Sequence, residues 1–176
     1  MRRSLRSSPG PRLLAAVACL VLIASAAACT GDDGAAETPA CGPITIDPQD
    51  TNQGHLLPGA PTPSFRTNPP TSGPHVAGLV VSGEMDRPVT PLEQVSTLET
   101  GAVIIQYRSS DDERDLAPLA RPDVVVAPGK DLPAPIVATG WVRSMRCDRV
   151  DAAALRRFID AVRGQYEGHT TTTTGG

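Results

Sequence analysis

Three short hydrophobic runs in the second half of the chain predict β-strands. They span residues 101–107, 123–127 and 136–142, are rich in β-branched side chains, and adjoin Gly, Pro or Ser. Apolar runs of about four to eight residues between turn formers are typical of buried strands. The sequence therefore predicts a small β-sheet in this part of the chain.

Two segments carry helix signals. Ser110 and Glu113 have the spacing of a capping box and predict a helix over 111–120, which Pro118 limits to about two turns. Asp148 is expected to cap a second helix over 150–163. This helix has an apolar stripe at helical spacing, which must cover the sheet: Ala154, Leu155, Phe158, Ile159 and Val162.

The order of these elements indicates the topology. The first two strands, joined by a helix, should be parallel, connected by a right-handed crossover. The third follows the second after a short turn and should run antiparallel to it. We therefore expect an α+β fold, in which a small mixed β-sheet is covered by two helices and preceded by a long Pro/Gly-rich N-terminal half.

The N-terminal half of the folded unit is dominated by loop formers. The chain has 18 Pro and 16 Gly, and the prolines are densest between residues 43 and 91, where no helix is expected. Only short strands at 44–46 and 78–81 are predicted there. Structureless stretches of this length in compact domains are usually functional or disordered.

The first residues have the layout of an export signal. Four arginines precede an apolar run over 13–24, and small residues follow up to residue 28. A membrane-spanning helix needs about 20 apolar residues, so this run is too short for a comfortable span. We expect residues 1–28 to be a signal peptide.

Cys29 directly follows three alanines, and this arrangement resembles the lipidation box of bacterial lipoproteins. In such proteins the cysteine becomes the acylated first residue, and each buried methylene contributes about 0.8 kcal/mol to anchoring. The usual Leu of the box is Ala26 here. The alternative is an ordinary secretory signal with an incidental cysteine. We expect Cys29 to carry lipid and to hold the protein on the extracytoplasmic face of the cell membrane.

Composition separates one folded unit from its flanks. Residues 29–40 are small and acidic and predict a flexible tether, whereas the threonine-rich residues 168–176 predict a disordered tail. A single domain is expected over 41–167. The net charge of −3 becomes more negative without the arginine-rich start. An acidic domain that lacks a basic cluster argues against nucleic acid as a partner.

The cysteines that remain after Cys29 are Cys41 and Cys147, at the two ends of the predicted domain. Exported domains with two cysteines usually join them, because the compartment is oxidising. The pair lacks the C-x-x-C spacing of redox-active dithiols. We expect a structural Cys41–Cys147 disulfide.

Residues 69–75 read Pro-Pro-Thr-Ser-Gly-Pro-His, a stiff loop that ends in an imidazole. This heptad, together with His55 upstream, Leu98-Glu99 downstream and Thr139-Gly140-Trp141, resembles the bacterial family known as domain of unknown function 3105. Members are typically exported or membrane-anchored, and the family has no established activity. The resemblance therefore implies an architecture and a location rather than a reaction.

The resemblance also implies a candidate metal site. The family typically has H-x-L-E-H-G where this chain has Ser96-Thr97-Leu98-Glu99-Thr100-Gly101, so both histidines of that motif are replaced. His55, His75 and Glu99 remain, and they would take copper or zinc if the fold brings them together. The alternatives are a solvent-facing His75 on a rigid turn, and a Glu99 that pairs with an arginine or accepts backbone N–H bonds.

The remaining patterns do not identify a reaction. The chain has no G-x-S-x-G, H-E-x-x-H, P-loop or Rossmann fingerprint, although an enzymatic role stays open. Trp141 is expected in the core rather than in a ligand site. We expect an envelope lipoprotein domain that binds the membrane through its lipid and has a non-catalytic binding or structural role with a protein or small-molecule partner. The alternative is a transition-metal protein that uses His55, His75 and Glu99.

Overall fold

The computed structural model describes residues 38–57 and 59–165. Single 3-10 turns, Ser110–Asp112 and Ala117–Leu119, flank the short second helix. The helices and strands follow in the order β1 (Thr45–Ile46), α1 (Pro91–Glu99), β2 (Val103–Tyr107), α2 (Glu113–Leu116), β3 (Val124–Pro128), β4 (Ile136–Gly140), β5 (Arg143–Cys147) and α3 (Ala152–Val162).

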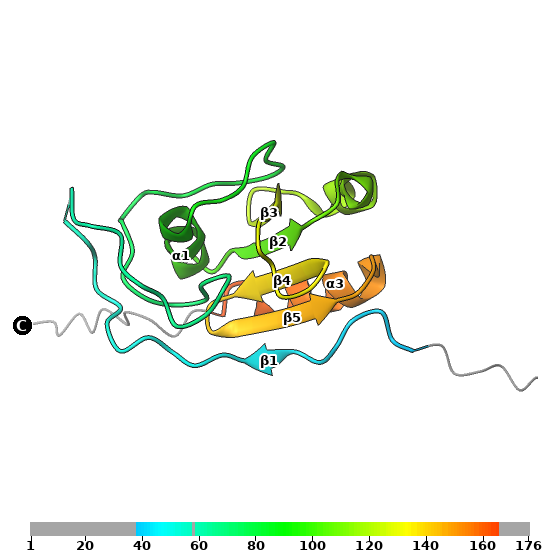
Figure 1. Ribbon diagram of the computed structural model, residues 1–176, viewed down its shortest axis with the longest axis horizontal. Coiled ribbons are helices and arrows are strands. Elements are labelled where there is room, and N and C mark those ends of the chain that lie inside the picture. The colour runs from blue at the N-terminus through cyan, green and yellow to red at the C-terminus, as the bar shows by residue number, and fades with distance from the viewer. Residues whose placement is uncertain (1–37, 58, 166–176) are drawn as a thin grey trace, which may run out of the picture. The chain divides into compact units, whose positions relative to one another are not determined.

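The strands form one mixed sheet in the order β1-β5-β4-β2-β3 (Figure 1). Strands β2 and β3 are parallel, with Val103 beside Val124, and the other neighbours are antiparallel. The predicted α+β class with a mixed sheet is confirmed, and so is the parallel pairing of the two strands that a helix joins.

Helices cover both faces of the sheet. On one face the side chains of Val103, Ile105 and Tyr107 pack with the apolar stripe of α3. On the other face Ile104 packs with Val95 and Leu98 of α1. Because successive residues of a strand point to opposite faces, β2 is buried on both sides and is hydrophobic except at Gln106.

Several predicted boundaries are wrong. The predicted helix over 111–120 is a single α-helical turn between two 3-10 turns, and Ser109 rather than Ser110 caps it. The last helix begins later than predicted, because Asp151 rather than Asp148 accepts the N–H of Ala154.

The strand predictions need three corrections. Residues 136–142 form β4 and then a two-residue turn that leads into β5, a strand that was not predicted. Strand β4 pairs with β2 and not with β3, so it is antiparallel to the preceding strand without being its neighbour. Residues 78–81 form no strand, and of residues 44–46 only Thr45 and Ile46 do.

Cys41 and Cys147 form the predicted disulfide, which fastens the first described segment to the end of β5. The residues are 106 apart in sequence. On the chain-entropy account a loop of this length stabilises the fold by about 4–5 kcal/mol. The predicted segments 1–28 and 168–176, and Cys29 itself, lie outside the described residues.

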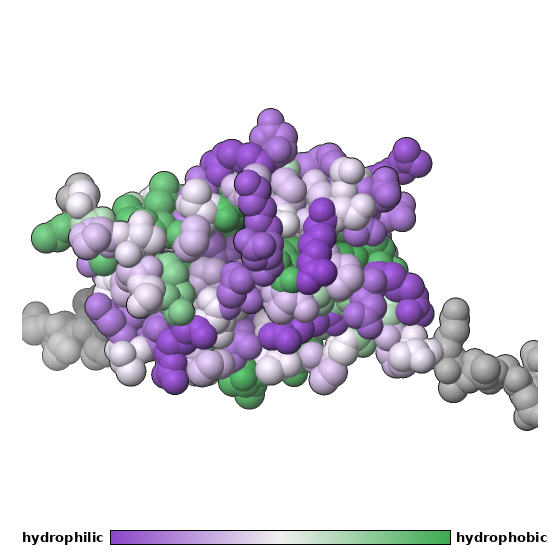
Figure 2. All heavy atoms as spheres, viewed as in Figure 1, coloured by the Kyte–Doolittle hydropathy of each residue, from purple (hydrophilic) through white to green (hydrophobic). Residues whose placement is uncertain are grey.

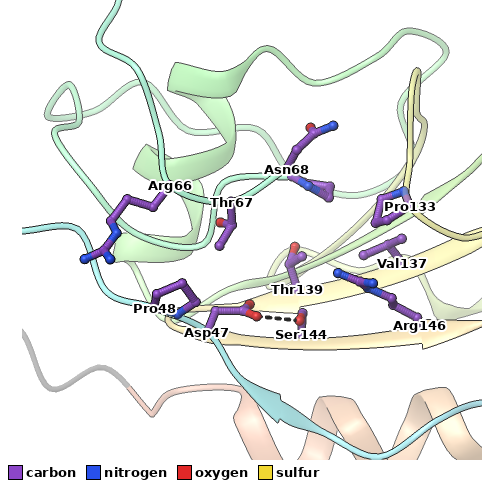
Figure 3. A pocket seen from close by; sticks show the side chains of 11 residues that line it. Asp47, Pro48, Arg66, Thr67, Asn68, Pro133, Val137, Thr139, Ser144 and Arg146 are labelled. Carbon is purple, nitrogen blue, oxygen red and sulfur yellow. Dashed lines mark hydrogen bonds between the residues drawn. The ribbon is translucent and has the colours of Figure 1, made fainter.

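The loop of residues 69–75 is buried along its whole length, although it has no regular secondary structure. The polar groups of its backbone are paired individually, by side chains and by the backbone of other segments. The N–H of Thr71 donates to the Thr67 hydroxyl, the carbonyl of Thr71 accepts from the N–H of Val142, and the Ser72 hydroxyl accepts from the N–H of Asp50. Beside it, the Ser144 hydroxyl donates to Asp47, so that the segment after β1 is fixed to β5 (Figure 3).

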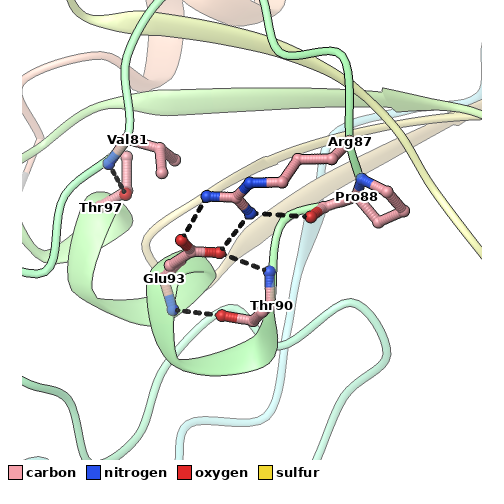
Figure 4. Close-up of polar contacts among 6 residues, drawn as sticks. All are labelled: Val81, Arg87, Pro88, Thr90, Glu93 and Thr97. Atoms are coloured by element: carbon pink, nitrogen blue, oxygen red, sulfur yellow. Dashed lines mark hydrogen bonds and ion pairs between the residues drawn. The ribbon is translucent and has the colours of Figure 1, made fainter.

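Helix α1 begins with a complete capping box (Figure 4). The Thr90 hydroxyl accepts from the N–H of Glu93, and the Glu93 carboxylate accepts from the N–H of Thr90. Arg87 adds two hydrogen bonds to the same carboxylate, at 2.7 and 2.9 Å. Near the other end of α1, the Thr97 hydroxyl accepts from the N–H of Val81, so the helix also holds the preceding loop.

The surface in view is mainly hydrophilic, with hydrophobic residues at the end where the loop around residue 57 lies and along the edge formed by β1 (Figure 2). The large hydrophobic side chains that are exposed in the described part of the chain are Ile44, Ile46, Leu57, Leu79 and Val80. No helix within residues 38–57 and 59–165 is long and apolar enough to cross a membrane.

The capping box makes the free energy of unfolding depend on pH. Hydrogen bonds from Arg87 lower the pKa of Glu93 from 4.5 to about 2. A carboxyl with a depressed folded-state pKa stabilises the fold above its unfolded pKa, and this contribution is lost as pH falls through the folded value. Glu93→Gln should therefore be most destabilising above pH 4.5, with a difference from wild type that shrinks toward pH 2. Denaturant unfolding across this pH range measures the difference in unfolding free energy between Glu93→Gln and wild type. Substitution of the exposed Asp160, Asp160→Asn, is the control. A pH-independent difference would contradict the assignment.

Gly73 is required by the buried loop. Its φ is 134°, and a Cβ there would lie 2.9 Å from the ring of Phe65. Gly73→Ala should destabilise the protein by about 1–3 kcal/mol, because both the backbone conformation and the ring must shift. Gly42→Ala is the control, since its Cβ would meet only the Arg146 carbonyl at 3.7 Å. Equal unfolding free energies for the two variants would show that the loop does not depend on this glycine.

Candidate functional site

His75 ends the buried loop, and its side chain is fully buried. Its Nδ1 lies 3.1 Å from the carbonyl oxygen of Gly73. A carbonyl oxygen can only accept, so Nδ1 carries the proton, and in the neutral ring Nε2 carries the free lone pair. This Nε2 is shielded from solvent and has no hydrogen-bond partner. The loop therefore holds a buried nitrogen ligand in one orientation.

Backbone pairing brings His55 to the same place. The N–H of Leu56 donates to the His75 carbonyl at 2.7 Å, and the N–H of His75 donates to the Gly54 carbonyl at 3.3 Å. These two bonds form a parallel bridge between His55 and His75. The imidazole rings meet edge to face, with their centroids 4.8 Å apart. His55 is exposed, so it forms the solvent side of the pair.

Glu99 approaches from the last turn of α1. Its Oε1 lies 3.9 Å from Nε2 of His75, and its side chain is 23% exposed. The last turn of α1 contains no basic residue. A carboxylate at the negative end of a helix dipole is unfavourable unless a cation lies nearby.

The three side chains form a metal-ligating cluster. One ligand atom from each of His55, His75 and Glu99 lies within 4.8 Å of the others. Zinc bonds to histidine nitrogen or carboxylate oxygen are about 2.0–2.2 Å long, so tetrahedral ligand atoms lie roughly 3.3 Å apart. Small side-chain rotations would close the present spacing.

The alternative explanations of these residues do not fit the structure. His75 is buried and does not face solvent. No arginine lies within 4.0 Å of Glu99 among the described residues. His75 and Glu99 share no hydrogen bond, since Nε2 and Oε1 are 3.9 Å apart.

Neighbouring residues also contact His75 and the residue that follows it. The Ser96 hydroxyl accepts from the N–H of Val76, directly after His75. Trp141 is 4% exposed and belongs to the core, as predicted, but its ring also stands perpendicular to His75 with centroids 6.1 Å apart. Trp141 occupies the β4–β5 turn, where the next residue, Val142, has a φ of 50°. Positive φ is rare for a β-branched residue.

Sequence reasoning placed Glu99 before a strand and missed the helix that carries it. The signal was present, because Thr90-Pro91-x-Glu93 combines an N-cap, a proline at the first helical position and an acid at the third. The role of Ser96 could not be found in this way, since a hydroxyl that accepts from a distant backbone N–H leaves no local pattern.

The comparisons with known proteins give a family but no activity. No curated protein and no solved structure matches the chain. A family model described as protein of unknown function (DUF3105) matches residues 61–175, which include His75, Glu99 and Trp141. This match spans more than half of the chain, and the chain therefore belongs to the DUF3105 family.

Proposed function

We propose that the protein binds a transition-metal ion, copper or zinc, through His55, His75 and Glu99. The observation that supports this most directly is the buried Nε2 of His75, which has no hydrogen-bond partner and is oriented by the Nδ1 contact to Gly73. A hydrogen bond from the second ring nitrogen to a backbone carbonyl is the usual support of a metal-bound histidine. A buried polar atom without a partner is costly in a structure that gains nothing from it.

The donor set favours Zn(II) or Cu(II). It consists of two imidazole nitrogens and one carboxylate oxygen, ligands that suit both ions. Thiolates would favour Cu(I), but the two cysteines among the described residues, Cys41 and Cys147, are joined in the disulfide. Zinc sites with two histidines and one glutamate typically keep a fourth position for water or substrate. His55 is exposed, so an ion here would be open to solvent on that side.

Two hydroxyl residues limit the site to three protein ligands. Ser96 and Thr100 stand where the resembling motif has histidines, and both hydroxyls are engaged. Ser96 accepts from the N–H of Val76, and Thr100 donates to the carbonyl of Thr97. We infer that this chain has lost the fuller histidine set of the motif and holds metal less tightly, in a role of capture or exchange rather than permanent storage.

We further propose that this domain acts outside the cytosol, anchored by lipid at Cys29. The Cys41–Cys147 disulfide supports this, because such bonds persist mainly in oxidising compartments. Binding is the role we assign to this site.

Metal titration tests the first proposal. Zn(II) or Cu(II) at about 100 times its Kd should raise the unfolding free energy by about 2.7 kcal/mol. His75→Ala and Glu99→Gln should each weaken binding by more than the about 10- to 100-fold typical of removing an outer partner. Calorimetry and thermal melting measure both effects.

His169→Ala serves as the matched histidine control and should leave binding unchanged. Metal affinity that is unaffected in both His75→Ala and Glu99→Gln would refute the site, even if the protein still binds metal elsewhere.

Cell fractionation tests the anchor. Wild-type protein should partition with membranes and yield an acylated N-terminal fragment by mass spectrometry, because several acyl chains give stable insertion. Cys29→Ser should lose the lipid mass and leave the membrane fraction, whereas Cys19→Ser, inside the apolar run, should change neither. Retention of Cys29→Ser protein on membranes without lipid would count against lipid anchoring.

A further inference from the structure

A cavity separate from the histidine site lies on the same face of the sheet as α1. It lies where β4 and β5 emerge from under the loop of residues 66–69 (Figure 3). Its volume is about 270 Å³. Prolines and Val137 form apolar walls, and the polar lining consists mainly of Asp47, Arg66, Thr67, Thr139, Ser144 and Arg146. None of these residues belongs to the histidine site.

The Asp47 carboxylate in this cavity is incompletely satisfied. Its Oδ1 accepts one hydrogen bond, from the Ser144 hydroxyl at 3.0 Å. Its Oδ2 is shielded from solvent and accepts none. An ionised carboxylate normally accepts several hydrogen bonds or faces a cation, and leaving it with one neutral donor in a half-buried position is unfavourable.

Guanidinium groups line the same cavity without neutralising this carboxylate. No ion pair within 4.0 Å joins Asp47 to Arg66 or Arg146 in the part of the chain that the structure describes. Arg66 donates instead to the Gln49 carbonyl. The Arg146 side chain extends from β5 toward Val137 and Thr139, on the other side of Ser144 from Asp47 (Figure 3).

Separated charges of opposite sign around one small cavity select a ligand that carries both charges. A simple anion would leave the Asp47 carboxylate without a cation, and a simple amine would leave the arginines without an anion. A molecule with an ammonium and a carboxylate group would satisfy both ends through charge-assisted hydrogen bonds, after a small rotation that turns Asp47 Oδ2 toward the cavity. The walls leave room for a short aliphatic side chain.

We propose that this cavity binds a small zwitterion of the α-amino acid class, with its ammonium group on Asp47 and its carboxylate on Arg146. The Ser144 hydroxyl positions the Asp47 carboxylate, and Arg66 adds positive charge at the rim. The proposal is independent of the histidine site, since no residue is shared.

Calorimetric titration of the purified full chain, freed of metal by chelation and desalting, tests this proposal with L-alanine as the probe. Propionate lacks the ammonium group and isopropylamine lacks the carboxylate, so these two probes separate the charges. We expect L-alanine to bind at least about tenfold more tightly than either analogue, the difference that one charged hydrogen bond typically makes.

Asp47→Asn keeps the shape of the side chain and the oxygen that accepts from Ser144. Arg146→Gln removes an exposed guanidinium. Each variant should weaken L-alanine binding at least about tenfold. Arg157→Gln on α3 is the matched control and should bind as wild type does. Glu99→Gln should also retain L-alanine binding, which distinguishes this site from the proposed metal site. If Asp47→Asn fails to fold, Arg146→Gln decides alone.

Three results would overturn the proposal. The first is no binding of L-alanine to wild-type protein, which would mean that the cavity holds only water. The second is equal binding of a single-charge analogue. The third is undiminished L-alanine binding in Arg146→Gln.

Discussion

The burial of an irregular loop is the constraint on which the rest of this structure depends. A buried backbone must have its polar groups paired, and residues 69–75 have no strand or helix partner to pair them. Side chains therefore take over this task. Hydroxyls of Thr67, Ser72 and Ser96 meet N–H groups in or beside the loop, and the N–H of Val142 reaches the Thr71 carbonyl from the β4–β5 turn.

The same loop serves both candidate sites. At the C-terminal end of the loop, His75 lies beside Glu99 in the last turn of α1. The first residue of the loop, Pro69, lines the cavity above β4 and β5 together with the preceding Thr67 and Asn68. A single rigid segment thus fixes the geometry at two places, and the prolines within it reduce the freedom that the unfolded chain would otherwise regain.

Features that produce a local sequence pattern or a distinct composition could be predicted from the sequence. The hydrophobic runs of β2 and β3 are buried on both faces and were recognised, and Cys41 and Cys147 were paired because they lie at the two ends of the predicted domain. Strand β5 was missed because its sequence, Arg143–Cys147, mixes charged and apolar residues, although the strand lies between β1 and β4 in the sheet. The hairpin before it was missed because Trp141-Val142 contains neither Gly nor Asn, the residues that favour positive φ.

The candidate site was predicted in its residues but not in its geometry. His55, His75 and Glu99 were grouped by resemblance, and the structure brings them together. No sequence rule indicates that His75 is buried while His55 is exposed, because that difference arises from packing of the loop against α1 and Trp141. Similarly, no sequence pattern singled out Asp47, since its position relative to Ser144 and Arg146 depends on pairing between β1 and β5 across about a hundred residues.

Several unfavourable features lie at these two sites, and we interpret them as functional in origin. A carboxylate lies at the negative end of α1, a buried imidazole nitrogen lacks a partner, a valine beside Trp141 has positive φ, and a second carboxylate is left with one hydrogen bond. Each typically costs on the order of 1–3 kcal/mol. A sheet buried on both faces and a disulfide across 106 residues supply the excess stability that lets such features persist. Features of this kind that contribute nothing to the fold are expected where a ligand completes them.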